Sequence, residues 1–229
     1  MQSIDPTAAS VLRHFEGAVA NQSEAVVTLY APEVFRLAVN DKELYASFYD
    51  LVRAGVRLPS EGFWDQVREA VDSRLFNYYK EHIRFAALSL NRRGLSHYGD
   101  CYLVLKENMI AHRATVFEEN SVVFMHRRQV PITGELPTGY RAIWQDRGRL
   151  AVAKLAASIS PNTVTADFPT LLLRDGKKPE DDQFVEVHIY GSLSIYSVAE
   201  VSLGGRGSAI RRKALTEKLA KYGVSLKSH

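Results

Sequence analysis

The sequence of 229 residues predicts an α+β fold, with a helical N-terminal part before a mostly antiparallel β core that has an inserted helix and a C-terminal helix. Over residues 1–80, apolar side chains recur at the spacing of amphipathic helices. After residue 81, short apolar, β-prone runs separated by turn residues replace that pattern. Strands that follow helices as a block are typical of the α+β class. We therefore expect a helical subdomain over residues 1–80 and the α+β core over residues 81–229.

Three amphipathic helices are expected in the N-terminal part, at residues 5–20, 41–55 and 60–82. Asp41 suits the N-cap of the second helix and Gly55 its end. Four aromatic residues, Trp64, Tyr78, Tyr79 and Trp144, could stack on nucleic-acid bases, but their helical spacing favours packing in a core.

The core is expected to contain six apolar strands and two helices. The strands are predicted at residues 83–90, 101–106, 121–126, 170–174, 184–191 and 193–203. The inserted helix is predicted at residues 139–160, just before Pro161, and the closing helix at residues 208–223.

The composition excludes several classes of protein. No apolar run reaches the length of a membrane span, so we expect no membrane partner. Cys101 is the only cysteine, which excludes an internal disulfide framework and a cysteine-based zinc site. The seven histidines lack metal-like spacing, so no metal is predicted. The N-terminus lacks the basic and apolar regions of a signal peptide, so we expect a cytoplasmic protein or one delivered into a target cell without a classical signal.

Two strands carry ionisable residues where apolar ones are expected. Alternation places Glu186 and His188 on one face of the strand at residues 184–191, between Phe184 and Tyr190. A carboxylate bracketed by aromatic rings suits a cleft that stacks a planar ligand, although a solvated strand face remains the alternative. Arg84 is the only charge in its strand and needs an anionic partner, either a cofactor phosphate or a carboxylate such as Glu186 or Asp100.

The pattern of these strands resembles an uncharacterised, toxin-like bacterial family across residues 83–224. That family has an arginine strand followed by alanine-leucine, a tyrosine-glycine strand ending in leucine-valine-leucine, an arginine-x-threonine segment with aspartate-serine, and a late glutamate strand. The matching residues here are Arg84, Ala87, Leu88, Tyr98, Gly99, Leu103, Val104, Leu105, Arg113, Thr115, Asn120, Ser121, Glu186, His188, Ile189 and Gly191. Three positions depart from the pattern: Asn120 replaces aspartate, His188 replaces glutamine and Tyr190 replaces histidine.

The same layout resembles the ADP-ribosyltransferase superfamily. That resemblance implies NAD as a substrate, with Glu186 stabilising the ribosyl cation that forms as nicotinamide leaves. It implies Arg84 and Ser121 as further catalytic residues. The cofactor-binding residues that it implies are Arg84, His97, Tyr98, Thr115, Asn120 and His188.

The resemblance therefore predicts a mono-ADP-ribosyltransferase of toxin or effector type. Its acceptor would be a protein or a nucleic acid, and an antitoxin or immunity protein could accompany it. Two other hypotheses stay open: a non-catalytic binding protein on the same fold, and an RNA-directed nuclease or phosphotransferase that uses His97, His112 and His188. The first hypothesis predicts that Arg84, Tyr98, Ser121 and Glu186 converge on one cleft.

Overall fold

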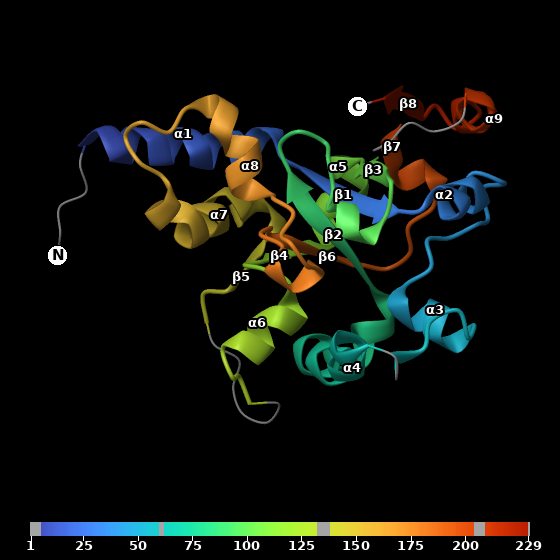
Figure 1. The fold of residues 1–229 in the computed structure, drawn as a ribbon, viewed down its shortest axis with the longest axis horizontal. Helices are drawn as coiled ribbons and strands as arrows, with labels where there is room; N and C mark the ends of the chain where they lie inside the picture. Colours follow the sequence, from blue (N-terminus) through green and yellow to red (C-terminus); the bar gives the residue numbers. More distant parts are fainter. Residues whose placement is uncertain (1–5, 60–61, 132–137, 204–208, 229) are drawn as a thin grey trace.

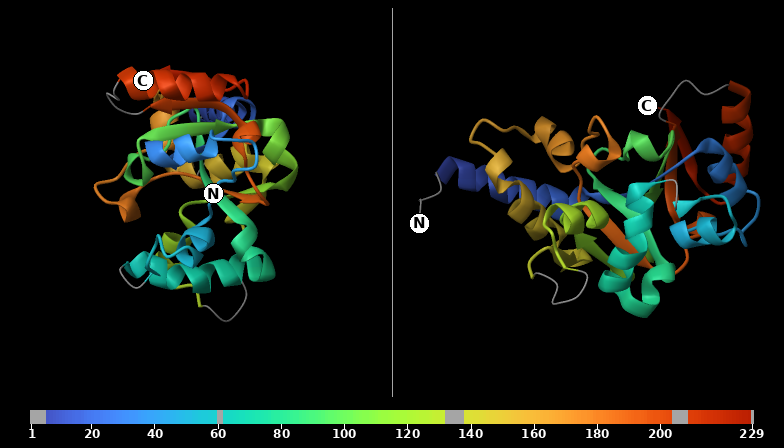
Figure 2. Two further views of the ribbon diagram at one scale, coloured as in Figure 1. Left: turned by 90° about the vertical axis from the view of Figure 1, so that its right-hand side faces the viewer. Right: turned by 60° about the horizontal axis from the view of Figure 1, so that its bottom comes forward.

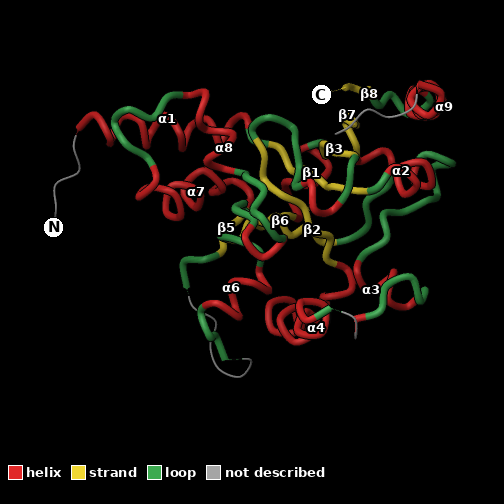
Figure 3. Tube along the Cα trace, viewed as in Figure 1, coloured by secondary structure: helices red, strands yellow, loops and turns green. Residues whose placement is uncertain are grey.

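The computed structural model describes residues 6–59, 62–131, 138–203 and 209–228 and shows a mixed α+β fold. Its strands form one sheet at the centre of the molecule, with the helices around it (Figures 1 and 3). The described strands are β1 (Glu24–Leu29), β2 (Ile83–Ser89), β3 (Cys101–Leu105), β4 (Ala114–Phe117), β5 (Arg141–Ile143), β6 (Glu186–Tyr190), β7 (Val198–Leu203) and β8 (Ser225–Ser228). The described helices are α1 (Pro6–Gln22), α2 (Ala31–Leu37), α3 (Phe48–Arg53), α4 (Phe63–Phe76), α5 (Glu107–Ile110), α6 (Ser121–Arg127), α7 (Arg147–Leu155), α8 (Phe168–Leu172) and α9 (Ala209–Ala220).

The sheet has the order β5-β4-β6-β2-β1-β3-β7-β8 and is antiparallel except at one edge, where β8 runs parallel to β7. β1 lies near the middle, because Val26 pairs with Ala87 of β2 on one side and with Val104 of β3 on the other. The predicted antiparallel core is therefore confirmed, and it includes a strand from the N-terminal part of the chain.

One face of the sheet carries the main apolar core. On this face Val187 and Ile189 of β6 are buried together with Phe15 of α1 and Leu150 of α7. α1 and α7 run side by side over this face (Figure 2). At their contact Gly148 lies so close to α1 that an added Cβ would approach the carbonyl oxygen of Glu16 to 2.6 Å. A glycine is therefore required for the close approach of the two helices.

The opposite face, here called the second face, is covered by α4 and α6 where β2, β6 and β4 lie. Phe85 and Phe117 on this face pack with Val71 and Phe76 of α4 and with Phe124 of α6. α4 and α9 lie at opposite ends of the molecule (Figures 1 and 2). The second face therefore has its own smaller apolar cluster, into which polar residues of β6 are inserted.

Five expectations about elements need correction. The expected helix at residues 41–55 begins only at Phe48, because its N-cap is Ser47, whose hydroxyl accepts the backbone N–H of Asp50, and not Asp41. The helical assignment of residues 1–80 is wrong for the β1 segment, a six-residue run of mostly apolar, β-branched side chains that suits a central strand. The segment 121–126 is helix α6, because the Asn120 side chain accepts hydrogen bonds from the backbone N–H groups of Val122 and Val123 and so starts a helix. The strand expected at residues 170–174 is not formed, because its first residues belong to helix α8. That helix begins at Phe168, and Pro169 lies in its first turn, a position that suits proline. The expected helix at residues 139–160 holds strand β5 before α7 begins at Arg147.

The predicted strands β2, β3, β6 and β7 and the closing helix α9 are confirmed. No helix in the ranges that the structure describes combines the length and the apolar character needed to cross a bilayer.

Candidate functional site

Glu186 and His188 form a buried polar pair on the second face. Their side chains lie on the same side of β6, and the carboxylate Oε2 of Glu186 accepts a hydrogen bond from Nε2 of His188 at 2.8 Å. The same oxygen accepts the backbone N–H of Ser121 at 2.9 Å, because α6 begins at that residue and its first N–H groups have no partner within the helix. Glu186 is 3% exposed and His188 2%, so water is excluded from the pair.

The environment of Glu186 favours its ionised form. Burial alone raises the pKa of Glu186, but the hydrogen bond and charge of His188, the charge of Arg68 and the hydrogen bond from Ser121 together lower it. An ionised carboxylate only accepts hydrogen bonds, so Nε2 of His188 carries the proton between them. Glu186 thus fixes the orientation of an imidazole whose second nitrogen, Nδ1, is buried and has no hydrogen-bond partner among the described residues.

Three phenylalanine rings surround His188. The imidazole lies edge-on to Phe76 at 4.9 Å and to Phe85 at 5.4 Å, and it is tilted against Phe117 at 5.7 Å between ring centroids. These contacts hold the ring in place and surround it with low-dielectric material, in which the bond to Glu186 is electrostatically stronger than in water.

His188 also lines a cavity of about 480 Å³ between α4 and the strands β2, β6, β4 and β5, within the size range of small-molecule sites. The cavity contains two arginines. Arg113 donates hydrogen bonds to the backbone carbonyls of Met109, Tyr190 and Ser192, and Arg141 has a long contact of 3.5 Å with the carbonyl of Leu75. Burial lowers the pKa of both guanidinium groups, and neither forms an ion pair with a carboxylate in the described part of the chain.

Two tyrosines stand at this cavity. Tyr79 and Tyr190 lie edge-to-face at 5.6 Å, and they are 58% and 47% exposed. The expectation that Tyr78 and Tyr79 pack in the core is therefore wrong, because both are exposed in the 3-10 turn Asn77–His82 that follows α4. Exposed aromatic faces beside two arginines are suited to a planar, anionic ligand.

The structure brings most of the predicted site residues to this region. Thr115 pairs with His188 across β4 and β6 and lines the cavity with it. Ser121 contacts Glu186 through its backbone, whereas its hydroxyl is buried without a hydrogen-bond partner in the described ranges. Tyr98 lies beside Asn120 and near Glu186. Burial, followed by the charges of Asp182 and Glu186, raises the pKa of Tyr98 to about 12.

Two predicted site residues lie elsewhere: His97, whose Nδ1 pairs with Asp182 outside the cavity, and Arg84. In the pairing of β2 with β6, Arg84 is opposite Ile189, whereas Ala87 is opposite Glu186. Side chains alternate between the two faces along a strand, so Arg84 and Glu186 point to opposite faces of the sheet. The Arg84 guanidinium forms an ion pair with Asp50 at 3.4 Å and donates to the carbonyl of Glu81 at 2.9 Å. The expected convergence of Arg84 and Glu186 on one cleft is therefore wrong, and Arg84 has a carboxylate partner of its own.

Sequence reasoning did not select Arg113, Arg141 or Tyr79 as site residues. Arg113 was visible in the arginine-x-threonine pattern, two residues before Thr115, and could have been chosen on that ground. Arg141 gave no signal, because its segment reads as a helix and the short strand β5 is formed only by pairing with β4.

Behind His188, α4 contributes a further buried acid. Asp72 is fully buried and accepts a hydrogen bond from the Tyr49 hydroxyl at 2.9 Å. Arg68 lies 3.8 Å from Asp72 and stacks over the Phe85 ring at 4.9 Å. Arg68 thus contributes positive charge near both Asp72 and Glu186.

Comparison with known proteins gives no family: no family model matches the sequence, and no curated protein matches it significantly. The resemblance to ADP-ribosyltransferases therefore stays a prediction, and the site has to be interpreted from its own chemistry.

Proposed function

We propose that the cavity binds the phosphates of a nucleotide and that the protein is an NAD-dependent ADP-ribosyltransferase with NAD bound there. The observation that supports this most is that Arg113 and Arg141 line the same cavity as Thr115 and His188. Neither arginine is paired with a described carboxylate. Thr115 and His188 are two of the residues that the resemblance implies for NAD binding. Guanidinium groups are the preferred protein partners of phosphate oxygens.

Each wall of the cavity has a part in this proposal. The diphosphate binds to Arg113 and Arg141, and an aromatic ring of the ligand stacks on Tyr79 or Tyr190. Glu186 is not in contact with the cavity, since His188 lies between them. Its negative charge acts on the cavity through His188 and favours positive charge that develops on the ligand.

The reaction breaks the bond between the ribose C1′ and the nicotinamide nitrogen, and nicotinamide leaves with the electron pair. A nucleophilic atom of the acceptor forms the new bond to C1′ and releases a proton. His188, held through Nε2 by Glu186, is the base in the cavity wall that can take this proton once the acceptor reaches its buried Nδ1, which has no described partner.

The binding half of this proposal is tested with Arg141, whose contacts within the protein are weak. We expect Arg141→Gln to weaken NAD binding at least about tenfold and Arg141→Lys to weaken it less, because a charge-assisted phosphate contact contributes about 1.5–3 kcal/mol. Isothermal titration calorimetry measures the affinity. Arg149→Gln is the matched control, since Arg149 lies on α7 with a side chain that is 77% exposed. A wild-type protein that does not bind NAD would end the proposal.

The catalytic half is tested in the same series with Glu186→Gln. The substitution keeps the size of the side chain and removes the charge, so nicotinamide release should fall by about a hundredfold while NAD affinity changes little. Thermal melts show whether the variant is folded. Turnover at the wild-type rate in a folded variant would exclude a catalytic effect of this charge, and equal losses of binding and turnover would make Glu186 a positioning residue.

A second candidate function is phosphodiester transfer on RNA. The favouring observation is His188, an imidazole that Glu186 holds in the wall of a cavity with two arginines that suit a phosphate. The two functions differ in their need for NAD. Cleavage of RNA oligonucleotides without NAD, lost in His188→Gln, would support this function over the first.

A further inference from the structure

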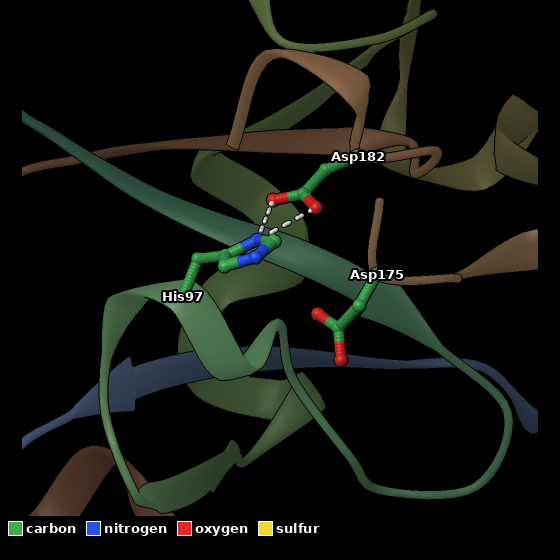
Figure 4. A group of neighbouring side chains, drawn as sticks. All are labelled: His97, Asp175 and Asp182. Carbon is green, nitrogen blue, oxygen red and sulfur yellow. Dashed lines mark hydrogen bonds and ion pairs between the residues drawn. The ribbon is translucent and has the colours of Figure 1, made fainter. Parts of the chain in front are cut away.

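A second polar cluster lies outside the cavity, where His97, Asp175 and Asp182 meet (Figure 4). His97 belongs to the 3-10 turn Ser96–Tyr98 that precedes β3. The two aspartates belong to the loop between α8 and β6, which is closed by the pairing of Arg174 with Gln183. His97 and Asp182 are separated by 85 positions in the sequence, which explains why the spacing of the histidines gives no sign of this cluster.

The imidazole lies between the two carboxylates (Figure 4). Nδ1 of His97 is 2.9 and 3.2 Å from the two carboxylate oxygens of Asp182. The backbone N–H of Gly176 donates to Asp182, and that of Ser96 donates to Asp175, each at 2.8 Å. Both carboxylates are therefore held by the backbone and not by each other.

Asp182 is in an unusual electrostatic position. Its side chain is 0% exposed, and its only ion-pair partner among the described residues is His97, an imidazole without a permanent charge. A buried carboxylate of this kind needs either a proton or a cation.

We propose that His97, Asp175 and Asp182 bind a divalent transition-metal cation through one imidazole nitrogen and two carboxylates. Their potential ligand atoms lie within 4.8 Å of one another. Ligands about 2.0–2.2 Å from a tetrahedral metal ion are about 3.3–3.6 Å apart, so the hydrogen-bonded Nδ1 and Asp182 oxygen, 2.9 Å apart, have to separate by only about 0.5 Å. The cation takes the place of the proton between His97 and Asp182, and the exposed Asp175 side chain needs only to turn toward them.

The ligand types indicate which cation fits. A nitrogen ligand beside two carboxylates suits zinc or manganese better than magnesium or calcium, which prefer oxygen ligands throughout. Three protein ligands leave at least one position for water, as in open metal sites. This site does not depend on the proposed function of the Arg113–Arg141 cavity, because the two share no residue.

The test is calorimetric titration of the tag-free, chelator-treated full chain with Zn²⁺, Mn²⁺, Mg²⁺ and Ca²⁺. We expect one equivalent of Zn²⁺ to bind in the micromolar range or tighter, with release of a proton seen as a dependence of the heat on the buffer. Mg²⁺ and Ca²⁺ should bind at least about tenfold more weakly.

Asp175→Asn is the main variant, because Asp175 is exposed and asparagine can still accept the N–H of Ser96. It should weaken Zn²⁺ binding at least about tenfold and abolish the rise in melting temperature that Zn²⁺ causes in the wild type. His97→Gln should do the same, whereas Asp181→Asn, at an exposed neighbouring position, should bind as the wild type does. A wild type that binds no Zn²⁺ at millimolar concentration would overturn the proposal. So would binding that is unchanged in both Asp175→Asn and His97→Gln.

Discussion

At the scale of single residues, the second face places charge where an apolar sheet is expected. Glu186 is tolerated there because His188 and the N–H of Ser121 donate to it and Arg68 lies near. A buried carboxylate is weak evidence for stability, since taking an ion out of water costs several kcal/mol. Retention of such a carboxylate beside a cavity with two arginines is more easily explained by function than by stability.

Asp72 gives a prediction about pH. Burial, partly offset by Arg68 and Tyr49 and reinforced by Glu186, raises the pKa of Asp72 from 3.8 to about 6. Because the pKa of Asp72 is higher in the folded state than in the unfolded state, the folded protein keeps the Asp72 proton up to a higher pH. The stability contributed by protonated Asp72 is therefore lost as the pH rises from about 4 to about 6.

We expect Asp72→Asn to remove this dependence. The free energy of unfolding of the variant, relative to the wild type, should rise by up to about 3 kcal/mol between pH 4 and pH 7. Urea denaturation at several pH values measures it, and a constant offset between the two proteins does not affect the result. Asp41→Asn, at an exposed position, is the control. A difference that stays constant over this pH range would show that the Asp72 pKa is not raised.

At the scale of elements, the sequence predicts which segments are strands better than it predicts which elements pack or pair with one another. The apolar runs of β2, β3, β6 and β7 are confirmed as strands, and the alternation that puts Glu186 and His188 on one face is confirmed as well. The segment that forms α6 is rich in valine and phenylalanine, so local propensity favours a strand. Capping by Asn120 and packing against α4 override that propensity. The cavity could not be predicted in the same way, because Arg141 joins it only through the pairing of β5 with β4.

The contact between α1 and α7 gives a prediction with an internal control. Alanine is a better helix former than glycine by about 1 kcal/mol, so Gly→Ala in a helix usually stabilises a protein. Gly17 in α1 has no atom within 4 Å of an added Cβ, whereas a Cβ at Gly148 in α7 would come within 2.6 Å of the Glu16 carbonyl oxygen. We expect Gly17→Ala to raise the melting temperature and Gly148→Ala to lower it by pushing the two helices apart. Differential scanning calorimetry of both variants measures this, and equal stabilisation by both would mean that the helices are not in close contact.

At the scale of the whole molecule, the position of β1 decides how the chain is divided. The helical subdomain expected over residues 1–80 contains β1, which pairs with both β2 and β3 in the sheet. α1 from the same part of the chain supplies Phe15 and Val19 to the main core. A sheet that loses a central strand exposes two unpaired edges and the apolar face that the lost elements covered.

We therefore expect a fragment of residues 81–229 to be unfolded or aggregated, although the sequence pattern marks this range as a core of its own. The matched comparison is a chain that ends at Val224, which lacks only the edge strand β8 and its pairing with β7. This shortened chain should remain folded with a lower melting temperature, because β7 loses one neighbour while the main core, including Leu215 and Leu219 of α9, is retained. Circular dichroism and the dispersion of amide signals in NMR distinguish the two outcomes. Cooperative unfolding of the fragment 81–229 would show that β1 is dispensable and that residues 1–80 are a separate unit after all.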